Sequence, residues 1–271
     1  MILQPKQSLF GSCLSKTNIR PSNAYGWKFQ LHKNSLVNKL LRLMGLPHLG
    51  SRIRNKIVME ELKKMDGKQY RVLDAGCGIG LTGFLLAEKG HKVTGIDIDS
   101  GKIKQAKQIK KENNYKNIDF LNKDLLRIKN NKEKFDIIIC LEVIEHVHSD
   151  KELLKVFAKL LKKDGFIIIS FPSPGFLSKI AQKSLDHFHV GYKPDDIRKI
   201  LSKKNLYISE EKSFGNTVLG KSVIALDFLF RKTLPILSGI FFPIFYPIVV
   251  FDYYLPSLSC PRGYVLVISK S

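Results

Sequence analysis

The chain has 271 residues and carries 45 Lys and Arg against 24 Asp and Glu, a formal net charge of +21 at pH 7. This length allows one large domain with additions and a full hydrophobic core. The charge favours a polyanionic neighbour, either a nucleic acid or an anionic membrane surface, although a solvated lysine-rich surface explains it equally well. The four cysteines form no Cys-x-x-Cys pair, which argues against a disulfide framework and favours reduced thiols in the cytoplasm.

The first 66 residues precede any regular strand pattern. Residues 1–34 show little periodicity and no apolar segment long enough for a secretory signal, so we expect a loosely ordered arm. Apolar residues at helical spacing predict two basic helices over 34–44 and 51–65. Five cations of the second helix are expected to be exposed: Arg52, Arg54, Lys56, Lys63 and Lys64. We expect these helices to form a lid over the site or a basic face toward a membrane.

A glycine-rich turn follows the first apolar strand. That strand ends at Asp74, and Gly76, Gly78 and Gly80 precede a helix that begins near residue 81. Glycine is needed where backbone passes close to a ligand or takes a positive φ, and the helix start offers free N–H groups. About twenty residues later a second strand ends in Asp97, a spacing that suits a carboxylate bound to a ribose diol. We therefore expect this stretch to hold a nucleoside-bearing cofactor.

Two classes of cofactor fit this run. Gly78, Gly80 and Gly83 match the dinucleotide signature G-x-G-x-x-G, which would make the chain an NAD-type oxidoreductase. However, the carboxylate of Asp74 would repel a pyrophosphate and attract a cationic ligand. The run over residues 72–80 resembles the first motif of the class I S-adenosylmethionine-dependent methyltransferases, whose methyl donor carries an amino group and a sulfonium. The resemblance implies S-adenosyl-L-methionine as the cofactor.

Strands and helices alternate regularly from residue 70 onward, which is typical of a parallel sheet with helices on both faces. The expected strands cover 70–75, 91–97, 117–121, 135–140 and 165–171, with two more near 206–213 and 263–269. The expected helices cover 81–89, 100–113, 149–162 and 193–204. The resemblance implies a Rossmann-like α/β sheet of seven strands in the order 3-2-1-4-5-7-6, with the seventh strand antiparallel.

Ligands of open α/β sheets bind at the carboxyl ends of the strands, where this chain carries suitable side chains. We expect Asp97 to accept hydrogen bonds from ribose hydroxyls, with Ile98 beside the adenine. The resemblance implies that Asp124 receives the adenine amino group and that Leu125 packs on its ring. Each acid alone would be an ordinary cap or turn residue. The complete expected cofactor set is Asp74, Gly76, Cys77, Gly78, Gly80, Asp97, Ile98, Asp124, Leu125 and Leu141.

The fourth strand leads into a Glu-x-x-Glu-His run, which resembles that of the ubiquinone-pathway O-methyltransferases and their relatives. On a helix, Glu142, Glu145 and His146 would share one face, and His187 or His189 would complete a site for a divalent metal such as Mg²⁺. The alternative is that the acid and the imidazole simply begin a helix.

A protonated methyl acceptor would require a general base near the same strand end. The candidates are Glu142, His146, His187 and His189, with Tyr192 as a group that orients the acceptor. The segment over 186–201 resembles a family pattern in which histidines that face the substrate precede a helix. These five residues are the expected catalytic set.

An uncharged stretch over 234–251 interrupts the pattern before the last strand. It just reaches the length of about 18 residues at which a spanning helix is conceivable. Pro235, Pro243 and Pro247 argue against a straight one, and a single crossing would separate the last strand from its sheet. We therefore expect residues 219–258 to contact a membrane as an interfacial or re-entrant hairpin. A buried roof over the site, or a dimer contact, is the alternative.

Together these patterns predict three parts: a lid over 1–66, a methyltransferase domain over 67–214 with 259–271, and an apolar insertion over 215–258. The hypothesis is methyl transfer to a small or lipid-like acceptor of lipid or quinone metabolism. It places a cytoplasmic protein at the membrane, as a peripheral or monotopic one. An RNA methyltransferase ranks second, because no added RNA-binding module is visible and the largest extra element is apolar. An NAD-type oxidoreductase and a non-catalytic cofactor-binding scaffold follow.

Overall fold

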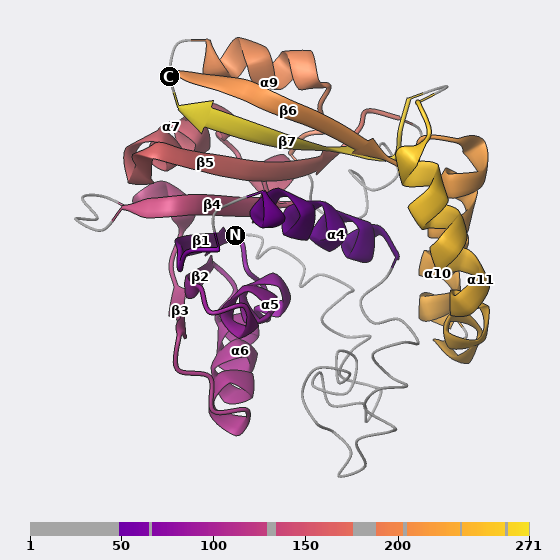
Figure 1. Ribbon diagram of the computed structural model, residues 1–271, viewed down its shortest axis with the longest axis horizontal. Coiled ribbons are helices and arrows are strands. Elements are labelled where there is room, and N and C mark those ends of the chain that lie inside the picture. The colour runs from indigo at the N-terminus through magenta and orange to yellow at the C-terminus, as the bar shows by residue number, and fades with distance from the viewer. Residues whose placement is uncertain are drawn as a thin grey trace, which may run out of the picture. The chain divides into compact units, whose positions relative to one another are not determined.

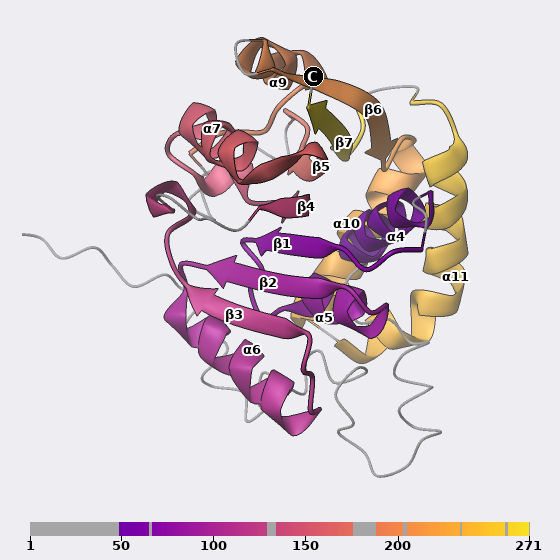
Figure 2. The ribbon, with the colours of Figure 1, turned by 60° about the vertical axis from the view of Figure 1, so that its left-hand side comes forward.

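The structure is a computed structural model that describes residues 49–64, 67–128, 134–175, 188–202, 205–233, 235–257 and 260–270. The expected arm over 1–34 and the helix over 34–44 lie outside these residues. The described part contains a seven-stranded sheet in the order β3-β2-β1-β4-β5-β7-β6, and Figure 2 shows the strands one above another in this order. The strands are β1 (Arg71–Ala75), β2 (Lys92–Asp97), β3 (Ile118–Asn122), β4 (Phe135–Leu141), β5 (Leu161–Pro172), β6 (Leu206–Phe214) and β7 (Gly263–Lys270).

The first five strands run parallel, and β7 pairs antiparallel with both β5 and β6, which confirms the predicted order and direction. The expected boundaries are confirmed within a few residues except at β5. That strand begins at Leu161 rather than at residue 165, because Leu161 pairs with Phe135 ahead of an irregularity in the ladder between β4 and β5. The preceding helix consequently ends at Leu160.

Helices cover the sheet on both faces (Figures 1 and 2). They are α4 (Leu49–Lys63), α5 (Leu81–Glu88), α6 (Ser100–Glu112), α7 (Asp150–Leu160), α9 (Pro194–Leu201), α10 (Val218–Thr233) and α11 (Pro235–Tyr254), with short 3-10 turns η1 (Leu125–Arg127) and η2 (Ile144–His146). The strands β4 and β5 are buried on both sides, which explains their continuous apolar runs. α7 places Leu153, Leu154 and Phe157 in the same core at helical spacing.

The predicted exposure of α4 is correct for its C-terminal end only. Lys63 and Lys64 are exposed, whereas Arg52, Arg54 and Lys56 are half-buried. The reason is that α4 packs against α10 and α11: the Arg52 guanidinium lies 4.6 Å from the centre of the Phe242 ring. The buried carboxylate of Asp227 on α10 accepts a hydrogen bond of 3.0 Å from the backbone N–H of Leu49, which caps the start of α4.

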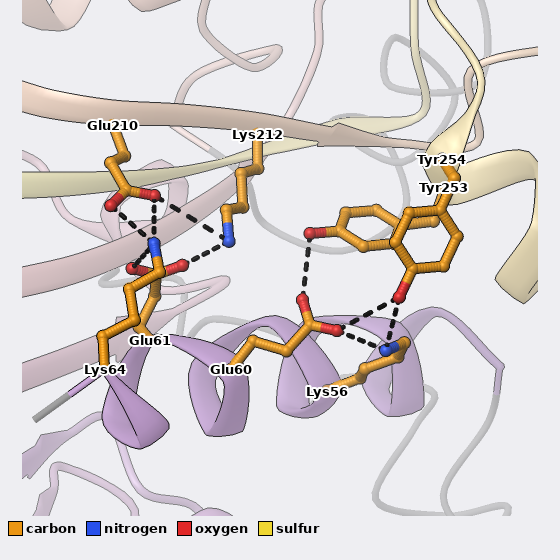
Figure 3. Close-up of polar contacts among 8 residues, drawn as sticks. All are labelled: Lys56, Glu60, Glu61, Lys64, Glu210, Lys212, Tyr253 and Tyr254. Atoms are coloured by element: carbon orange, nitrogen blue, oxygen red, sulfur yellow. Dashed lines mark hydrogen bonds and ion pairs between the residues drawn. The ribbon is translucent and has the colours of Figure 1, made fainter.

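Two polar clusters fix α4 to its neighbours, as Figure 3 shows. In one, Lys64 Nζ lies 2.6 Å from Glu210 of β6 and 2.9 Å from the buried Glu61, which also pairs with Lys212. In the other, Tyr253 OH at the end of α11 donates to Glu60 at 3.1 Å. α4 is therefore held from both sides.

The apolar insertion folds into two helices, α10 and α11, which lie side by side in both views (Figures 1 and 2). Asp252 near the end of α11 caps the start of α10: its buried carboxylate accepts from the backbone N–H groups of Asn216 and Thr217, both at 2.8 Å. A Cβ at Gly220 would lie 2.2 Å from Asp252 Cγ, so only glycine lets the helices meet there. α11 continues through Pro243 and Pro247. Among the described helices, none combines the length and apolarity needed to span a bilayer.

Candidate active site

The glycine loop between β1 and α5 is held to the end of β2 by its backbone. The N–H groups of Gly76 and Cys77 both donate to the carbonyl of Ile96, at 2.7 and 3.1 Å. Gly76, Gly78 and Gly80 have φ values of 74°, 55° and 84°, which other residues adopt only with strain. The loop therefore has the conformation that the three alternating glycines predict.

The three glycines face different surroundings. A Cβ at Gly76 would lie 2.3 Å from Val143 Cγ2, and one at Gly80 would lie 2.4 Å from Phe120 Cζ, so both positions need glycine for close packing. A Cβ at Gly78 would meet nothing nearer than Lys102 Cδ at 4.0 Å. Gly78 thus leaves an open face at which a ligand can approach the backbone.

Asp97, at the end of β2, is buried and closes one side of this loop. Its Oδ2 accepts from the Gly78 N–H at 2.7 Å and its Oδ1 from the Asp99 N–H at 2.9 Å. Each carboxylate oxygen keeps a further lone pair for a hydroxyl donor. Ile98, the next residue, has a 72% exposed apolar side chain. An acid and an exposed apolar surface side by side fit a ribose and an adenine ring.

Asp74 lies buried behind the loop. Its Oδ2 accepts a hydrogen bond of 3.0 Å from the Gly83 N–H of α5. Burial raises the pKa of this carboxyl to about 7, opposed by the Gly83 hydrogen bond and aided by the negative charge of Asp97. A cationic ligand would favour the charged form. The expected contact between Asp74 and the donor's cationic groups stays a prediction.

Gly83 also explains why the dinucleotide signature misleads. A Cβ at this position would lie 2.8 Å from Ile118 Cδ1 and 3.1 Å from Asp74 Oδ2. The third glycine of the signature therefore serves the packing of α5 on the sheet, and it needs no pyrophosphate to account for it.

Of the remaining residues of the expected cofactor set, Asp124 and Leu125 follow the end of β3, and Leu141 is the last residue of β4. Cys77 lies in the glycine loop itself. Asp124 caps η1 by accepting from the Leu126 N–H at 2.9 Å, and Leu125 is buried. Asn122 Nδ2 donates to the carbonyls of Asp97 and Ile98, at 3.0 and 2.8 Å, and so ties the end of β3 to the end of β2. Cys77 is buried and unpaired, and burial raises the pKa of its thiol. We call residues 74–80, 97–98 and 122–125 the glycine side.

The Glu-x-x-Glu-His run after β4 does not form the predicted helix. Glu142 has a φ of 56°, and only Ile144–His146 form a single 3-10 turn. Glu142, Glu145 and His146 therefore do not share one helical face. Glu145 is buried and His146 is exposed.

This bend also bears on the expected metal site. Within the described residues, no three His, Cys, Asp or Glu side chains lie where they could hold a metal ion together. The proposed ligands Glu142, Glu145, His146 and His189 are all among the residues described, and His187 lies outside them. The described candidates are therefore not brought together, because the chain bends at Glu142 where the prediction assumed a helix, and a metal site completed by His187 stays a prediction.

Glu142 is held by β5 and by α4. The Ser170 hydroxyl donates to its Oε1 at 3.1 Å, and its Oε2 lies 3.7 Å from Arg54 Nη1. The neighbouring Glu145 has a buried Oε2 with no hydrogen-bond partner among the described residues. Burial, and then the charge of Glu142, raise the pKa of Glu145 well above its usual value. Burial and the nearby charge of Glu142 therefore favour the protonated form of Glu145.

Of the other expected catalytic residues, His189 and Tyr192 lie against this strand end. The His189 N–H donates to the Glu145 carbonyl at 3.2 Å, and within the described residues its buried Nε2 has no partner. The centres of the His189 and Tyr192 rings lie 5.2 Å apart. Tyr192 OH donates to Asp150 at 3.3 Å, and burial and that carboxylate raise its pKa. Tyr192 keeps its proton, which suits an orienting role better than a base.

Sequence reasoning missed two arginines at this place. Arg54 was expected on the surface, yet its side chain is only 11% exposed and faces Glu142. Arg262 follows Pro261 and belongs to no recognisable motif. The charge of Glu142 raises the pKa of its guanidinium, and the charge of Arg54 lowers it. Asn55, beside Arg54, accepts from the Thr82 hydroxyl at 3.0 Å and so joins α4 to the start of α5. We call Arg54, Glu142, Glu145, His189 and Arg262 the arginine side.

Comparison with known proteins agrees with this geometry. The family described as a methyltransferase domain matches residues 66–213, more than half of the chain. A ubiquinone biosynthesis O-methyltransferase of Rickettsia bellii is 30% identical over 182 residues, which cover 62% of this chain and 75% of that protein.

Solved structures share the fold. The magnesium protoporphyrin IX methyltransferase from Synechocystis PCC 6803, solved with bound S-adenosylhomocysteine, aligns with a TM-score of 0.56 at 21% identity, over 92% of both chains. A putative sarcosine dimethylglycine methyltransferase from Galdieria sulphuraria aligns with a TM-score of 0.61 at 15% identity, over 82% of this chain and 86% of that one. The glycine loop, the strand order and the family match agree, and the chain belongs to the class I S-adenosylmethionine-dependent methyltransferases.

Proposed function

We propose that this enzyme is an O-methyltransferase that acts on a lipid-like small molecule of the quinone-precursor class at a membrane surface. The relatives named for ubiquinone biosynthesis support the class of acceptor. The observation that carries the membrane surface is the outer face of α11.

The outer face of α11 is an apolar stripe. Apart from the adjacent pair Pro243 and Ile244, its members are spaced three or four residues apart, and all are exposed: Ile240, Pro243, Ile244, Pro247, Phe251 and Tyr254. Ile240, Ile244 and Phe251 are 59%, 57% and 67% exposed. The opposite face buries Phe242, Phe245 and Val249. A helix on the surface of a soluble domain normally turns polar residues outward, so this stripe calls for an apolar neighbour.

A lipid surface suits this stripe for two further reasons. The net charge of +21 favours attraction to anionic lipids, which strengthens the binding of an apolar helix face at an interface. Tyr254, which is 64% exposed, stands at one end of α11, where amphipathic rings serve as interface anchors. Arg52 and Lys56 of α4 lie against the rings of the same helix.

S-adenosylmethionine supplies, when bound, an electrophilic methyl group on an already activated leaving group. The chain contributes alignment and exclusion of water, which are worth several kcal/mol in well-oriented systems. We assign cofactor binding to Asp74, Gly76, Cys77, Gly78, Gly80, Asp97, Ile98, Asp124, Leu125 and Leu141. A hydroxyl acceptor must lose its proton as its oxygen bonds to the methyl carbon, and Glu142 and His189 are the candidates to receive it.

We also propose the three-part organisation of the chain, with residues 1–66 as a cap, 67–214 and 259–271 as the catalytic domain, and 215–258 as the membrane-contacting insertion. Removal of the insertion would be a poor test, because Asp227 within it caps α4. Substitutions on the outer stripe leave that cap intact.

The test is co-sedimentation of the full chain with vesicles of phosphatidylcholine and phosphatidylglycerol that carry a prenylated 3,4-dihydroxybenzoate, which is a catechol. The wild-type protein should pellet with the vesicles and transfer labelled methyl to the catechol. The triple variant Ile240→Glu, Ile244→Glu, Phe251→Glu should lose vesicle binding by about 100-fold, because three apolar side chains leave the interface and three anions enter it. Its affinity for S-adenosylmethionine should be unchanged.

The matched control is Tyr207→Glu, which changes a 52% exposed aromatic residue on β6. It should bind vesicles like the wild type. The membrane surface would be rejected if the triple variant bound vesicles as well as the wild type does. It would also be rejected if the wild type were a dimer and the triple variant became a monomer with unchanged vesicle binding. Transfer of labelled methyl to added RNA, with none to the lipid-borne catechol, would reject the proposed class of acceptor.

A further inference from the structure

Two guanidinium groups and one carboxylate meet at the carboxyl end of β4. Arg54 of α4 lies 3.7 Å from Glu142 and its Nη2 donates to the Ser51 hydroxyl at 3.0 Å. Its guanidinium also lies 5.7 Å from the centre of the Phe214 ring, at the end of β6. Arg262 enters from the segment that leads into β7, and Glu142 attracts its charge while Arg54 repels it.

Arg262 is held firmly by its backbone. Its N–H donates to the carbonyls of Phe214 and Gly215, at 2.9 and 3.0 Å, and its carbonyl accepts from Ser173 at 3.2 Å. A Cβ at Gly215 would lie 2.5 Å from Arg262 Cβ, so glycine at this position lets the chain pass close to the stem of Arg262. Because the backbone of Arg262 is fixed, less conformational entropy is lost when its guanidinium binds a ligand.

The guanidinium of Arg262 makes no hydrogen bond or ion pair with any residue of the described part. Burial, ahead of Arg54, lowers its pKa below the ordinary arginine value. A half-buried guanidinium offers five donors, and leaving them without acceptors is costly. The guanidinium is therefore available to an acceptor from outside the described chain.

The charges at this corner do not balance. Arg54 pairs with Glu142 at 3.7 Å, whereas the Arg262 guanidinium has no ion-pair partner among the described residues, so its positive charge has no counterpart there. A monoanionic carboxylate would balance it, whereas a phosphate monoester would bring close to two negative charges. Guanidinium groups also bind carboxylates through two parallel hydrogen bonds.

We infer that Arg262, supported by Arg54, binds a carboxylate group of the methyl acceptor. The site adjoins the glycine side, because Val143, next to Glu142, packs against Gly76. An acceptor anchored there would present its remaining atoms toward Glu142 and His189. This inference rests on the proposed function and narrows it to acidic acceptors.

The experiment compares two probes of equal size, 3,4-dihydroxybenzoate and 3,4-dihydroxybenzamide. Isothermal titration into the full chain saturated with S-adenosylhomocysteine measures binding without turnover. The wild type should bind the benzoate at least about tenfold more tightly than the amide, because a charge-assisted hydrogen-bonded pair contributes about that much to affinity. In Arg262→Gln the preference should fall below about twofold, and Arg262→Lys should retain part of it because the charge stays and the fork is lost.

Arg198→Gln is the control, since Arg198 is a cation of α9 that pairs with Asp195 and Glu211. It should keep the full preference, and every variant should bind S-adenosylhomocysteine within about twofold of the wild type. A wild-type protein that does not prefer the benzoate, or a preference unchanged in Arg262→Gln, overturns the carboxylate site. Carboxylate preference without methylation of any acceptor leaves the site standing and rejects the proposed function instead.

Discussion

The glycine side and the arginine side occupy the same edge of one sheet, yet they are built in different ways. The glycine side comes from consecutive residues: Gly76, Gly78 and Asp97 are brought together by a single strand–helix–strand unit and by backbone hydrogen bonds. The arginine side draws on α4, β4, β5 and the segment before β7, and side chains hold it together. A local motif suffices for a shared cofactor, whereas acceptor specificity requires long-range assembly.

The sharpest way to break this contrast is to change the glycines one at a time. Gly76→Ala should lower the free energy of unfolding by about 3–4 kcal/mol, because it adds left-handed strain to overpacking against Val143. Gly78→Ala should cost only about 1 kcal/mol, since its Cβ meets open space, but should weaken S-adenosylmethionine binding at least about tenfold. Chemical denaturation and isothermal titration measure the two effects.

Gly90→Ala is the matched control, because Gly90 has a φ of 89° and a Cβ there would meet nothing within 4 Å. It should cost the same about 1 kcal/mol and leave cofactor affinity intact. If Gly78→Ala bound the cofactor as well as Gly90→Ala does, the open face of Gly78 would not be the approach to the backbone.

A second change tests whether the hairpin of α10 and α11 supports the glycine side. Asp252→Ala removes the cap of α10 and leaves two backbone N–H groups without an acceptor, at a cost of about 2–3 kcal/mol. Hydrogen exchange should speed up in α10 and α11, while cofactor affinity should change less than about twofold.

Asp99→Ala serves for comparison, since Asp99 caps α6 through one hydrogen bond of 3.0 Å to Lys102 at an exposed position. Asp99→Ala should lower the free energy of unfolding by about 1 kcal/mol, which is about half the loss expected for Asp252→Ala. Loss of cofactor binding in Asp252→Ala would mean that the hairpin supports the glycine side as well.

A further test concerns pH. The pKa of Asp74 is raised to about 7 in the folded protein, so the folded state binds more protons than the unfolded one above about pH 4. The free energy of unfolding should therefore fall as the pH rises to about 7, and then level off. A cationic donor favours the ionised carboxyl, so its affinity should rise about tenfold between pH 6 and 8.

Asp74→Asn should remove both pH dependences, because the amide can still accept from Gly83 but does not titrate. Titrations at several pH values, with the Asn variant run alongside, decide the matter. An affinity that stays flat with pH in the wild type would show that the donor does not sense this carboxyl.

The same contrast explains how far sequence reasoning could reach. The strand order and the glycine loop follow from patterns of neighbouring residues, and both are confirmed. The bend at Glu142 could not be foreseen, since its φ of 56° depends on Ser170 of a different strand. Nor could Arg54 and Arg262, which are 208 positions apart and lie near the same carboxylate only after the fold has formed. The half-buried part of α4 was missed because α10 and α11, which cover it, lie far along the chain.

The hairpin of α10 and α11 leaves the sheet at Phe214 and returns at Gly263, and these two residues are partners in the ladder between β6 and β7. Its exit and entry are therefore adjacent, as in an ordinary β-turn. Such an insert can change in length or sequence without altering the register of any strand. The same catalytic fold could therefore gain a different binding surface or a different acceptor while the methyl-transfer site stayed unchanged.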